Sequence, residues 1–577
     1  MAVALYAGFW LELESPATAA ITVGILAAPS RGQALEKAGF RFAGTVIGVI
    51  ASIVLVGSLS QARDLFFLAF ALWVGFCVYV SALSDGFRAY GAVLAGYTVA
   101  LVGIQQIDTP NNVFDFGMQR GAAIALGIAA LALVNDLLVA PDRHLALVGQ
   151  LAALHRRVRE QATVLIRGEA IDALLTAGLL REIAALRSEI TSLVTESSNG
   201  PIRSAAARST AVALVAEVHA VRVLQALPAD IDTAVRDRMA SALEAGDDWL
   251  ASMLPMSASL EWAFRELLRR DRDVRGNLAA MRSGQAPVRT WRTPFYACHR
   301  LAAETGVRAA LRIALASVTF ILAGWPAAAA SLILITAFMG LGVITPNPRG
   351  FTTAALIGCP IGVLLAGVLD FLVLGHVTAF PLLALGLAPF MIGAAVLSTV
   401  RNPLLAGIGR MNLIVILVVA ALANQQTYDA EVFLETALLV CLGPFVLLAA
   451  QILVPPVSDE RRRRLLLASA RREVGCAQPY EPEEAMFRDA VRIGQIAGAD
   501  RVVLEEALQL FDQAALIRLS EASLRELPAG LANRARRALV DRDARAVRRV
   551  AVDILEAAPA TSRALEVASF VIEEKAP

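Results

Sequence analysis

The chain has 577 residues, of which 57% are hydrophobic and 18% are charged, and its net charge at pH 7 is +1. Because soluble domains are about 45–50% apolar and about 25% charged, this composition indicates a membrane protein, and the near-zero net charge gives no support for nucleic-acid binding. The apolar residues concentrate in two blocks, near residues 1–140 and 307–455, and Arg, Asp and Glu concentrate in the other two blocks. We therefore expect two membrane segments and two water-facing segments.

Twelve apolar runs follow one another through the two membrane segments. A helix needs roughly 20 mostly apolar residues to cross the hydrocarbon core. The first run, Val3–Leu13, is shorter than that, and no cleavable signal peptide is recognisable in it. Since no alternating strand pattern appears, we predict an all-α membrane protein with about twelve transmembrane helices in two six-helix halves. The other predicted spans are Ala17–Ala28, Gly39–Leu59, Leu65–Leu83, Tyr90–Ile104, Gly121–Val139, Val307–Gly324, Ala327–Ile344, Thr352–Leu374, Val377–Ser398, Asn412–Ala423 and Val432–Leu453.

The two charged blocks carry apolar residues at three-to-four spacing, which is the pattern of amphipathic helices. Each membrane half is thus followed by a helical domain, with predicted boundaries at 1–141, 142–306, 307–454 and 455–577. The predicted helices of these domains are Leu145–Ile166, Ile171–Val194, Ile202–Leu227 and Ala229–Leu254, then Glu483–Ala497, Asp500–Leu519, Leu531–Ala557 and Ser562–Glu574.

Neither charged block contains a P-loop, a dinucleotide-binding fingerprint or a kinase signature. This absence disfavours a pump driven by its own nucleotide hydrolysis. The five cysteines and five histidines are dispersed, with no metal-ligand spacing and no Ser/His/Asp or Cys/His constellation. We therefore expect no enzyme activity, no cofactor and no metal site.

The orientation of the spans follows from the basic residues in the short loops, which favour the cytoplasmic side. The loops after the second, fourth and sixth spans carry Arg31, Arg88 and Arg143, and the corresponding loops of the second half are also basic. On the other side, the segment 105–119 carries Asp108 and Asp115 without Lys or Arg, and Arg63 is the exception. The pattern predicts that both helical domains are cytoplasmic.

Arg41 stands at the predicted entry to the third span, beside Gly44, Thr45 and Gly48. One interpretation is an anion contact at a helix N-terminus, where free amides and the helix dipole assist. The other is a cytoplasmic anchor beside small residues that let helices pack closely. Arg120, at the predicted start of the sixth span, is a second cation at membrane depth.

Aromatic residues accompany these cations in the same half of the chain. Trp73 and Tyr79 lie on the fourth span, where a packing stripe and a substrate wall are both compatible with their spacing. Arg88 and Tyr90 stand where the fourth span turns into the fifth, and Tyr97 and Thr98 lie in the middle of the fifth span, as a site lining or as packing residues. With Arg41, Thr45 and Arg120, these residues are the candidates for a substrate path.

Four carboxylates are candidates for proton coupling, because a carboxylate facing a membrane cavity can carry a proton. A position at the membrane interface, or a loop salt bridge for the first, is the alternative explanation. The four are Asp85, Asp136, Asp370 and Glu435.

Several segments of the first half occur in a characteristic order and spacing. They are Pro29-Ser30-Arg31-Gly32, Arg41-Phe42-Ala43-Gly44-Thr45-Val46-Ile47-Gly48, Leu72-Trp73-Val74-Gly75-Phe76-Cys77-Val78-Tyr79, Arg88-Ala89-Tyr90, Leu94-Ala95-Gly96-Tyr97-Thr98, and Phe114 leading to Arg120 and Gly127. This arrangement resembles one family, the fusaric acid resistance (FUSC-type) and aromatic acid exporter proteins of bacterial inner membranes. The chain departs from the family pattern where Ala17-Thr18 replaces an aromatic pair and where Ala123 stands in place of a frequent acid.

The resemblance implies an inner-membrane efflux transporter that exports aromatic carboxylic acids or similar small toxic organic acids. It further implies that the proton gradient drives export and that a periplasmic adaptor (membrane fusion) protein takes part. The alternative is a passive organic-anion channel, because the layout also resembles malate-channel proteins, in which two fused units would form one pore. A third reading is a membrane scaffold or an enzyme with a membrane half. The substrate, the coupling ion, the adaptor and the presence of a homo-oligomer stay open.

Overall fold

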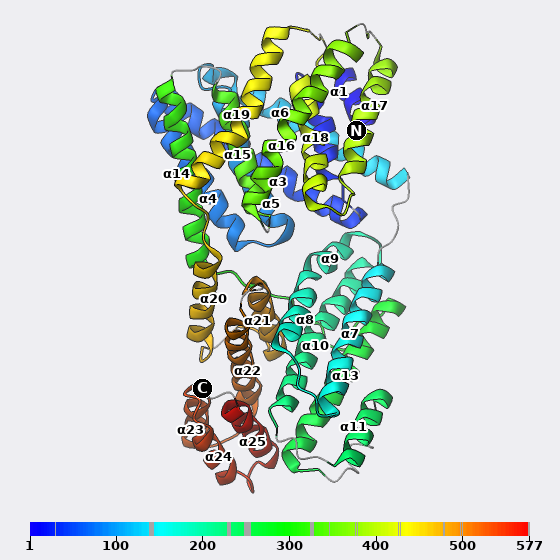
Figure 1. Ribbon diagram of the computed structural model, residues 1–577, viewed down its shortest axis with the longest axis vertical. Helices are drawn as coiled ribbons and strands as arrows, with labels where there is room; N and C mark the ends of the chain where they lie inside the picture. The colour runs from blue at the N-terminus through cyan, green and yellow to red at the C-terminus, as the bar shows by residue number, and fades with distance from the viewer. Residues whose placement is uncertain are drawn as a thin grey trace. The chain divides into compact units, whose positions relative to one another are not determined.

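The computed structural model describes residues 1–28, 30–137, 144–227, 232–246, 256–323, 328–345, 347–375, 377, 379–424, 426, 428–476, 479–496, 498 and 500–574. Every regular element within these ranges is a helix (Figure 1). The chain forms two compact units. We call Met1–Pro141 with His299–Ser458 the membrane unit, and Asp142–Cys298 with Asp459–Pro577 the polar unit.

The membrane unit contains a helix at each position where an apolar run predicts one. In its first half these are α1 (Ala2–Trp10), α2 (Pro16–Leu26), α3 (Arg31–Leu59), α4 (Arg63–Leu83), α5 (Gly86–Val99) continued by the π-helix η1 (Ala100–Ile104), the short η2 (Pro110–Asn112), and α6 (Val113–Leu137). In its second half they are α14 (His299–Ala323), α15 (Ala328–Val343), α16 (Pro348–Gly367) continued by the π-helix η4 (Val368–Val373), α17 (Phe380–Leu397), α18 (Pro403–Ala420) and α19 (Ala430–Leu453).

Nine helices in the described part of the chain are long and apolar enough to cross a membrane. The segments Pro16–Leu26 and Ser331–Val343 are apolar but shorter, and α1 has only 9 residues. The protein is therefore an all-helical, multi-pass membrane protein. The number of twelve crossings and their division into two six-helix halves stay predictions.

Several helices begin earlier than their apolar runs. α3 begins at Arg31 instead of Gly39, and the side chain of Ser30 caps it by accepting a hydrogen bond from the Gln33 amide at 3.2 Å. The predicted basic connector is thus the first two turns of the same helix. Arg41 consequently lies inside α3, which corrects its predicted place at a helix N-terminus.

The same correction applies to other helix starts. α6 begins at Val113, so Arg120 lies two turns inside it and does not open it. α14 begins at His299 and α18 at Pro403, each several residues before the predicted span. The predicted span limits Val139, Gly324 and Ala327 lie outside the described residues, as do Pro29, Arg143 and the two ends of the predicted helix Ala229–Leu254.

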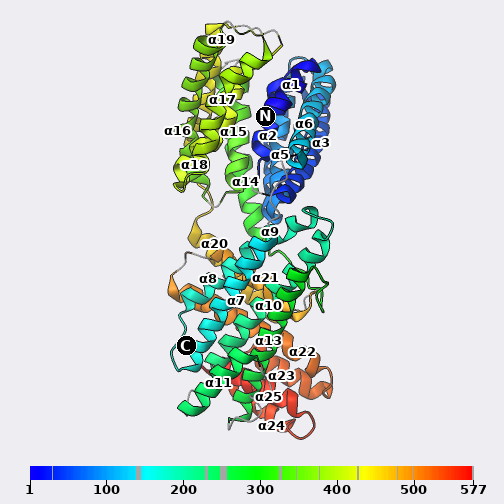
Figure 2. The same cartoon turned by 90° about the vertical axis from the view of Figure 1, so that its right-hand side faces the viewer.

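The two halves of the membrane unit repeat the same helix pairings: α3 packs on α5 as α16 packs on α18, and α2 packs on α6 as α15 packs on α19. Glycines mark the close approaches. A Cβ at Gly44 would strike the Gly91 carbonyl, and one at Gly362 would lie 2.6 Å from the Asn412 side chain. Figure 2 shows the helices of the first half gathered beside those of the second. The halves meet where α4 packs on α14, at Gly75 and Gly306.

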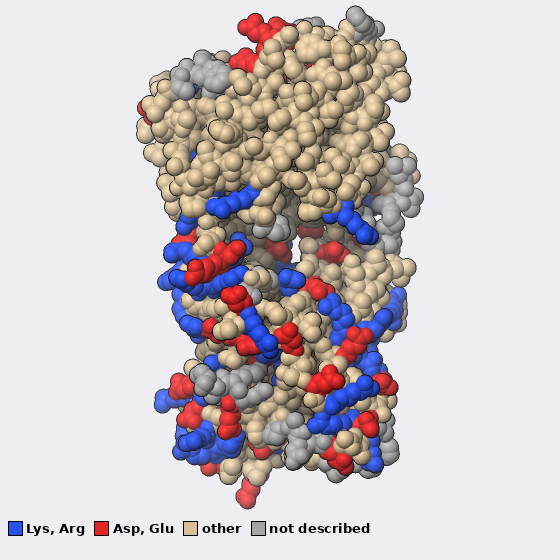
Figure 3. Space-filling view, viewed as in Figure 1, with Lys and Arg blue, Asp and Glu red and all other residues tan. Residues whose placement is uncertain are grey.

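The polar unit is a helical bundle built from both charged blocks. Its central helix is α10 (Gly200–Gln225), which is buried on nearly all sides because it packs on α7, α13, α21 and α22. Figure 3 shows many charged side chains on this unit and few on the visible face of the membrane unit. The other helices of the unit are α7 (His144–Ile166), α8 (Ala173–Ala185), α9 (Arg187–Ser192), η3 (Leu193–Thr195), α11 (Thr233–Ala245), α13 (Ala258–Ser283), α20 (Asp459–Glu473), α21 (Pro482–Ile496), α22 (Arg501–Leu524), α23 (Ala529–Val540), α24 (Ala544–Asp553) and α25 (Pro559–Glu574).

Three features of the polar unit depart from the predicted helices. The predicted helix Ile171–Val194 is divided into α8, α9 and η3, and the predicted helix Leu531–Ala557 is divided into α23 and α24. The second division falls at Arg542, which has a left-handed backbone with φ 57°. α13 and α20 were not predicted, because their high charge hides the apolar stripe.

Candidate functional site

Arg41 is the centre of a polar cluster inside the membrane unit. Its side chain leaves α3 and is almost fully buried, with 4% exposure. Nη1 donates a 2.6 Å hydrogen bond to the hydroxyl of Tyr90 on α5, and Nη2 donates a 3.3 Å bond to Thr22 on α2. Its Nε is buried without a partner. The guanidinium therefore keeps one donor for a further group.

Tyr97 and Arg120 complete the cluster. Tyr97 follows Tyr90 by two helical turns and so lies on the same face of α5; it interacts with both Tyr90 and Arg41. Arg120 reaches the cluster from α6 and interacts with Arg41 and Tyr97, and its Nε is also buried without a partner. Side chains from α2, α3, α5 and α6 thus converge on one point.

A third cation borders this cluster. The Nζ atom of Lys37 lies 2.5 Å from the carbonyl oxygen of Ile25 and 5.5 Å from the ring centre of Tyr90. Neither Lys37 nor Thr22 was predicted as a site residue. The four-residue spacing of Lys37 and Arg41 was a usable signal, because it places both side chains on one helix face.

The electrostatics of the cluster favour an anion. Within the described residues, no carboxylate forms an ion pair with Lys37, Arg41 or Arg120. Cations held together in a medium of low dielectric repel each other strongly, and an unpaired charge at membrane depth is expensive. A guanidinium offers a planar fork of donors that matches a carboxylate. The charge of a carboxylate would complement the cations of the cluster, and tyrosine rings lie beside them.

The remaining path candidates lie outside the cluster. Trp73 donates a 3.1 Å bond from Nε1 to the Ala95 carbonyl and so fixes α4 to α5. Thr45 bonds the Arg41 carbonyl within its own helix, at 2.9 Å, and Thr98 packs against Gly48. The hydroxyl of Tyr79 shares a 3.1 Å bond with Nδ1 of His299 at an exposed position. Arg88 is exposed.

The four carboxylate candidates differ in their surroundings. Asp370 is 5% exposed, lies in the π-helix η4, and has one carboxylate oxygen, Oδ1, without a partner. It lines a cavity of about 130 Å³ together with Gln426, Tyr428 and Thr436.

The other three carboxylates are more exposed than Asp370. Asp136 is half-exposed and forms a 2.6 Å ion pair with Arg31. Glu435 is exposed, and Asp85 stands at the N-cap position of α5. Asp370 is thus the buried member of the group.

One cluster in the polar unit has metal-ligand residue types. His155, Glu217 and Asp271 are buried, and their ligand atoms lie within 4.8 Å of one another. Asp271, however, already pairs with Arg159 at 3.3 Å and with Arg275 at 2.7 Å. Two guanidinium groups beside the carboxylates oppose a further cation, so we read the cluster as a buried ion network.

The pKa values of this network have clear physical causes. Burial acts to lower the pKa of His155, but its hydrogen bonds to Asp271 and Glu217 outweigh burial and raise the pKa to about 9. Burial raises the pKa of Glu217, and His155 offsets part of that rise. The imidazole is therefore charged at neutral pH and joins α7 to α10 and α13.

The fold and the site define a multi-pass helical membrane protein with a buried cationic cluster in its first half. The family model described as the fusaric acid resistance protein family matches residues 1–575, and the chain belongs to this family. The resemblance seen in the sequence is thereby confirmed.

Relatives from several bacteria carry names that describe transport. The chain is 26% identical over 509 residues to an uncharacterized transporter, GOX0755, of Gluconobacter oxydans (strain 621H), covering 76% of this chain and 66% of the relative. It is 27% identical over 408 residues to the p-hydroxybenzoic acid efflux pump subunit AaeB of Edwardsiella tarda (strain FL6-60), covering 62% of this chain and 61% of the relative.

A further AaeB subunit, from Musicola paradisiaca (strain Ech703), is 26% identical over 496 residues, covering 78% of this chain and 73% of the relative. The chain thus spans slightly less than two thirds of the length of the first two relatives. No solved structure matches it.

Proposed function

We propose that this protein is an efflux transporter that exports aromatic carboxylic acids, or similar small toxic organic acids, across the bacterial inner membrane. The observation that carries the proposal is Arg41, a buried guanidinium that binds Tyr90, has an unused Nε donor and has no carboxylate partner among the described residues. Arg41 and Arg120 supply the charge that a carboxylate needs, and Tyr90 and Tyr97 supply aromatic surface. Family membership and the names of the relatives support the same substrate class.

Proton coupling forms the second part of the proposal. Asp370 is buried, keeps an unpartnered oxygen and lines a cavity, and these are the properties of a carboxylate that can bind and release a proton. Its location in a π-helix agrees with the frequent use of such segments at functional sites. Uptake of a proton at Asp370 would accompany release of the organic anion.

The last part of the proposal concerns the partners of the protein and its placement in the membrane. The relatives' description as pump subunits supports a periplasmic adaptor as a partner, and the basic loops support a cytoplasmic place for the polar unit. The chain would contact membrane lipid through the apolar faces of its spans.

The test is transport of p-hydroxybenzoate into everted membrane vesicles energised by respiration. We expect uphill uptake in wild type that collapses when a protonophore is added. Arg41→Gln should reduce the rate at low substrate at least tenfold, and Arg41→Lys should restore part of it, because lysine keeps the charge but not the fork. Arg401→Gln is the matched control, since Arg401 is exposed on the same unit.

Two results would contradict the proposal. Wild-type transport by Arg41→Gln, at equal protein level in the membrane, would reduce Arg41 to a structural anchor. Substrate flux that never exceeds equilibrium and ignores the protonophore would support the alternative, a passive organic-anion channel.

A further inference from the structure

A cavity of about 210 Å³ lies inside the polar unit. Helices α10, α13, α21, α22 and α25 contribute its walls, so both charged blocks of the sequence take part. Most of its lining is apolar and includes Trp262, Met486 and Leu516. An apolar protein cavity of about 150 Å³ accommodates benzene. This cavity is therefore large enough for a substituted aromatic ring.

His219 gives the cavity a directed polar group. Its side chain is buried, with 3% exposure, and lines the cavity. Its Nδ1 lies 3.2 Å from a carboxylate oxygen of Asp512, while its Nε2 has no partner in the part of the chain that the structure describes. A carboxylate only accepts hydrogen bonds, so Nδ1 carries a proton, and Nε2 is an acceptor when the ring is neutral.

Asp512 and Phe511 hold the His219 ring in its orientation. Arg222 holds Asp512 with bonds of 3.0 and 2.6 Å to Oδ2, from Nε and Nη2. The ring of Phe511 packs edge-on against the imidazole, with ring centres 5.7 Å apart. A buried polar atom without a hydrogen-bond partner destabilises the protein, and a hydroxyl group at Nε2 would remove that cost. The ligand should therefore present a hydroxyl group to Nε2.

The charged residues around the cavity are already balanced. Arg270 pairs with Glu266 at 2.7 Å and with Glu483 at 2.9 Å, and Arg269 pairs with Glu266 at 2.8 Å. Burial acts to raise the pKa of Glu266, but these arginines outweigh it and keep the pKa below its usual value. The ligand therefore needs no charge of its own.

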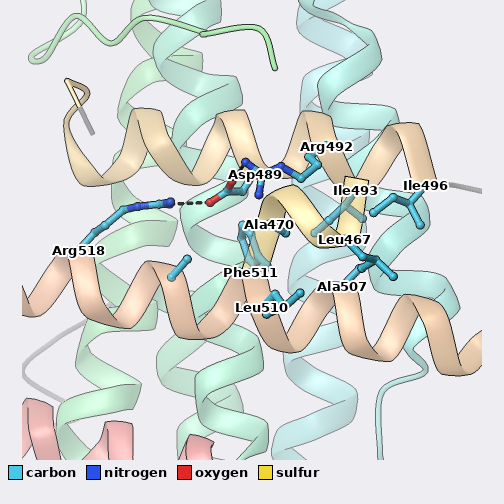
Figure 4. A pocket seen from close by; sticks show the side chains of 11 residues that line it. Leu467, Ala470, Asp489, Arg492, Ile493, Ile496, Ala507, Leu510, Phe511 and Arg518 are labelled. Atoms are coloured by element: carbon cyan, nitrogen blue, oxygen red, sulfur yellow. Dashed lines mark hydrogen bonds and ion pairs between the residues drawn. The ribbon is translucent and has the colours of Figure 1, made fainter. Parts of the chain in front are cut away.

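A second pocket of the polar unit is much smaller than this cavity. It lies between α20, α21 and α22 and measures about 20 Å³, which is room for one water molecule (Figure 4). Its polar side chains are tied to one another, with Asp489 bound to Arg518 at 2.5 Å. Of these two cavities, only the larger combines ligand-sized space with an unpartnered buried ring nitrogen.

We propose that this cavity is a binding site for a small neutral phenol, with the ring between Trp262 and Leu516 and the hydroxyl donating to Nε2 of His219. The site is independent of the Arg41 cluster and does not rest on the proposed transport function. A bound phenol would join helices of the two charged blocks and so stabilise the polar unit.

The experiment titrates the full-length protein in detergent with 4-fluorophenol and follows the probe by fluorine NMR. 4-Fluorotoluene is the matched probe, because a methyl group replaces the hydroxyl without changing the ring. We expect saturable binding of 4-fluorophenol and at least tenfold weaker binding of 4-fluorotoluene. The melting temperature should rise with 4-fluorophenol.

Variants assign the binding to this cavity. His219→Phe should abolish the preference for the hydroxyl, and Ala220→Leu should weaken binding of both probes at least tenfold by filling the space. Arg401→Gln is the control, since Arg401 is exposed and lies in neither proposed site, and it should bind 4-fluorophenol as wild type does. Absence of saturable binding in wild type, equal affinity for the two probes, or unchanged selectivity in a folded His219→Phe variant would each overturn the assignment.

Discussion

Nη1 of Arg41 donates a 2.6 Å hydrogen bond to the hydroxyl of Tyr90, a residue 49 positions later in the chain. The bond joins α3 to α5 inside the membrane unit, and Tyr97 and Arg120 interact with the same guanidinium. A charged donor held in this way is pre-organised to bind an anion. The first prediction tests that bond.

Tyr90→Phe removes the hydroxyl and leaves one buried N–H of Arg41 unpaired. A hydrogen bond to a charged group contributes roughly 1.5–3 kcal/mol, so the half-saturating concentration for p-hydroxybenzoate transport should rise about tenfold or more. Vesicle transport at varied substrate concentration measures it. Tyr79→Phe is the control, since its hydroxyl bonds His299 at an exposed position. Equal changes in both variants would contradict the role of the pair.

Gly44→Ala tests the close packing that brings α3 to α5. The added Cβ would strike the backbone carbonyl of Gly91, which cannot rotate away. Overpacking of this kind typically destabilises a protein by about 1–3 kcal/mol, so the melting temperature and the membrane level of the protein should both fall. Gly57→Ala, on the same helix with no atom within 4 Å of the new Cβ, should leave both unchanged. A Gly44→Ala variant as stable as Gly57→Ala would show that the helices separate at no cost.

Asp370→Asn tests proton coupling. The amide cannot take up a proton, so uphill accumulation driven by the gradient should fall at least tenfold. Exchange of labelled for unlabelled p-hydroxybenzoate, which needs no net proton movement, should persist. Glu435→Gln is the control because Glu435 is exposed. Full uphill transport by Asp370→Asn would exclude this carboxylate from coupling.

The ion network of His155 predicts a dependence of stability on pH. Its pKa in the folded protein is about 9, above the ordinary value of 6.5, so its contribution is fully present below pH 6.5 and is lost as the pH rises through 9. Each pKa unit corresponds to about 1.4 kcal/mol, which gives a loss of roughly 3 kcal/mol. Thermal unfolding between pH 6 and 10 measures it.

His155→Gln is the comparison for that measurement. The variant lacks the titrating ring, although Glu217, Asp271, Arg159 and Arg275 still face the position. It should be less stable than wild type below pH 7, and the difference should shrink toward pH 10. A constant difference across the range would mean that the ring contributes packing alone.

The apolar runs predicted the positions of the membrane helices but not where they begin. A run stops at the first charge, whereas the helix that holds Arg41 continues back through Lys37 to Arg31 because its backbone hydrogen bonds are satisfied there. The prediction therefore placed Arg41 at a helix end. Hydropathy is a property of one segment, and a buried cation is stabilised by other segments.

Part of the candidate site was predictable, because Arg41, Tyr90, Tyr97 and Arg120 were each identified as candidates for a substrate path. Their convergence was not predictable, since it depends on how the glycines of α3 let α5 approach. For the same reason, the sequence did not indicate that Trp73 and Thr98 lie in contacts between helices outside this cluster. In the polar unit, the role of Asp512 was not predictable, because its partners His219 and Arg222 belong to the other charged block.

That last pairing has a consequence for how the protein is made. Arg222 and Asp512 are separated by 290 residues, and the second membrane half lies between them. At about 5–20 residues per second, Asp512 leaves the ribosome on the order of 15–60 s after Arg222. Until then α10 cannot form its full set of contacts with α21 and α22, including the bond of Arg222 to its partner. The bundle thus reaches its final state only after the second set of membrane helices has been synthesised. A chain truncated before Asp512 should therefore be degraded as an unfolded protein, even though its first membrane helices are intact.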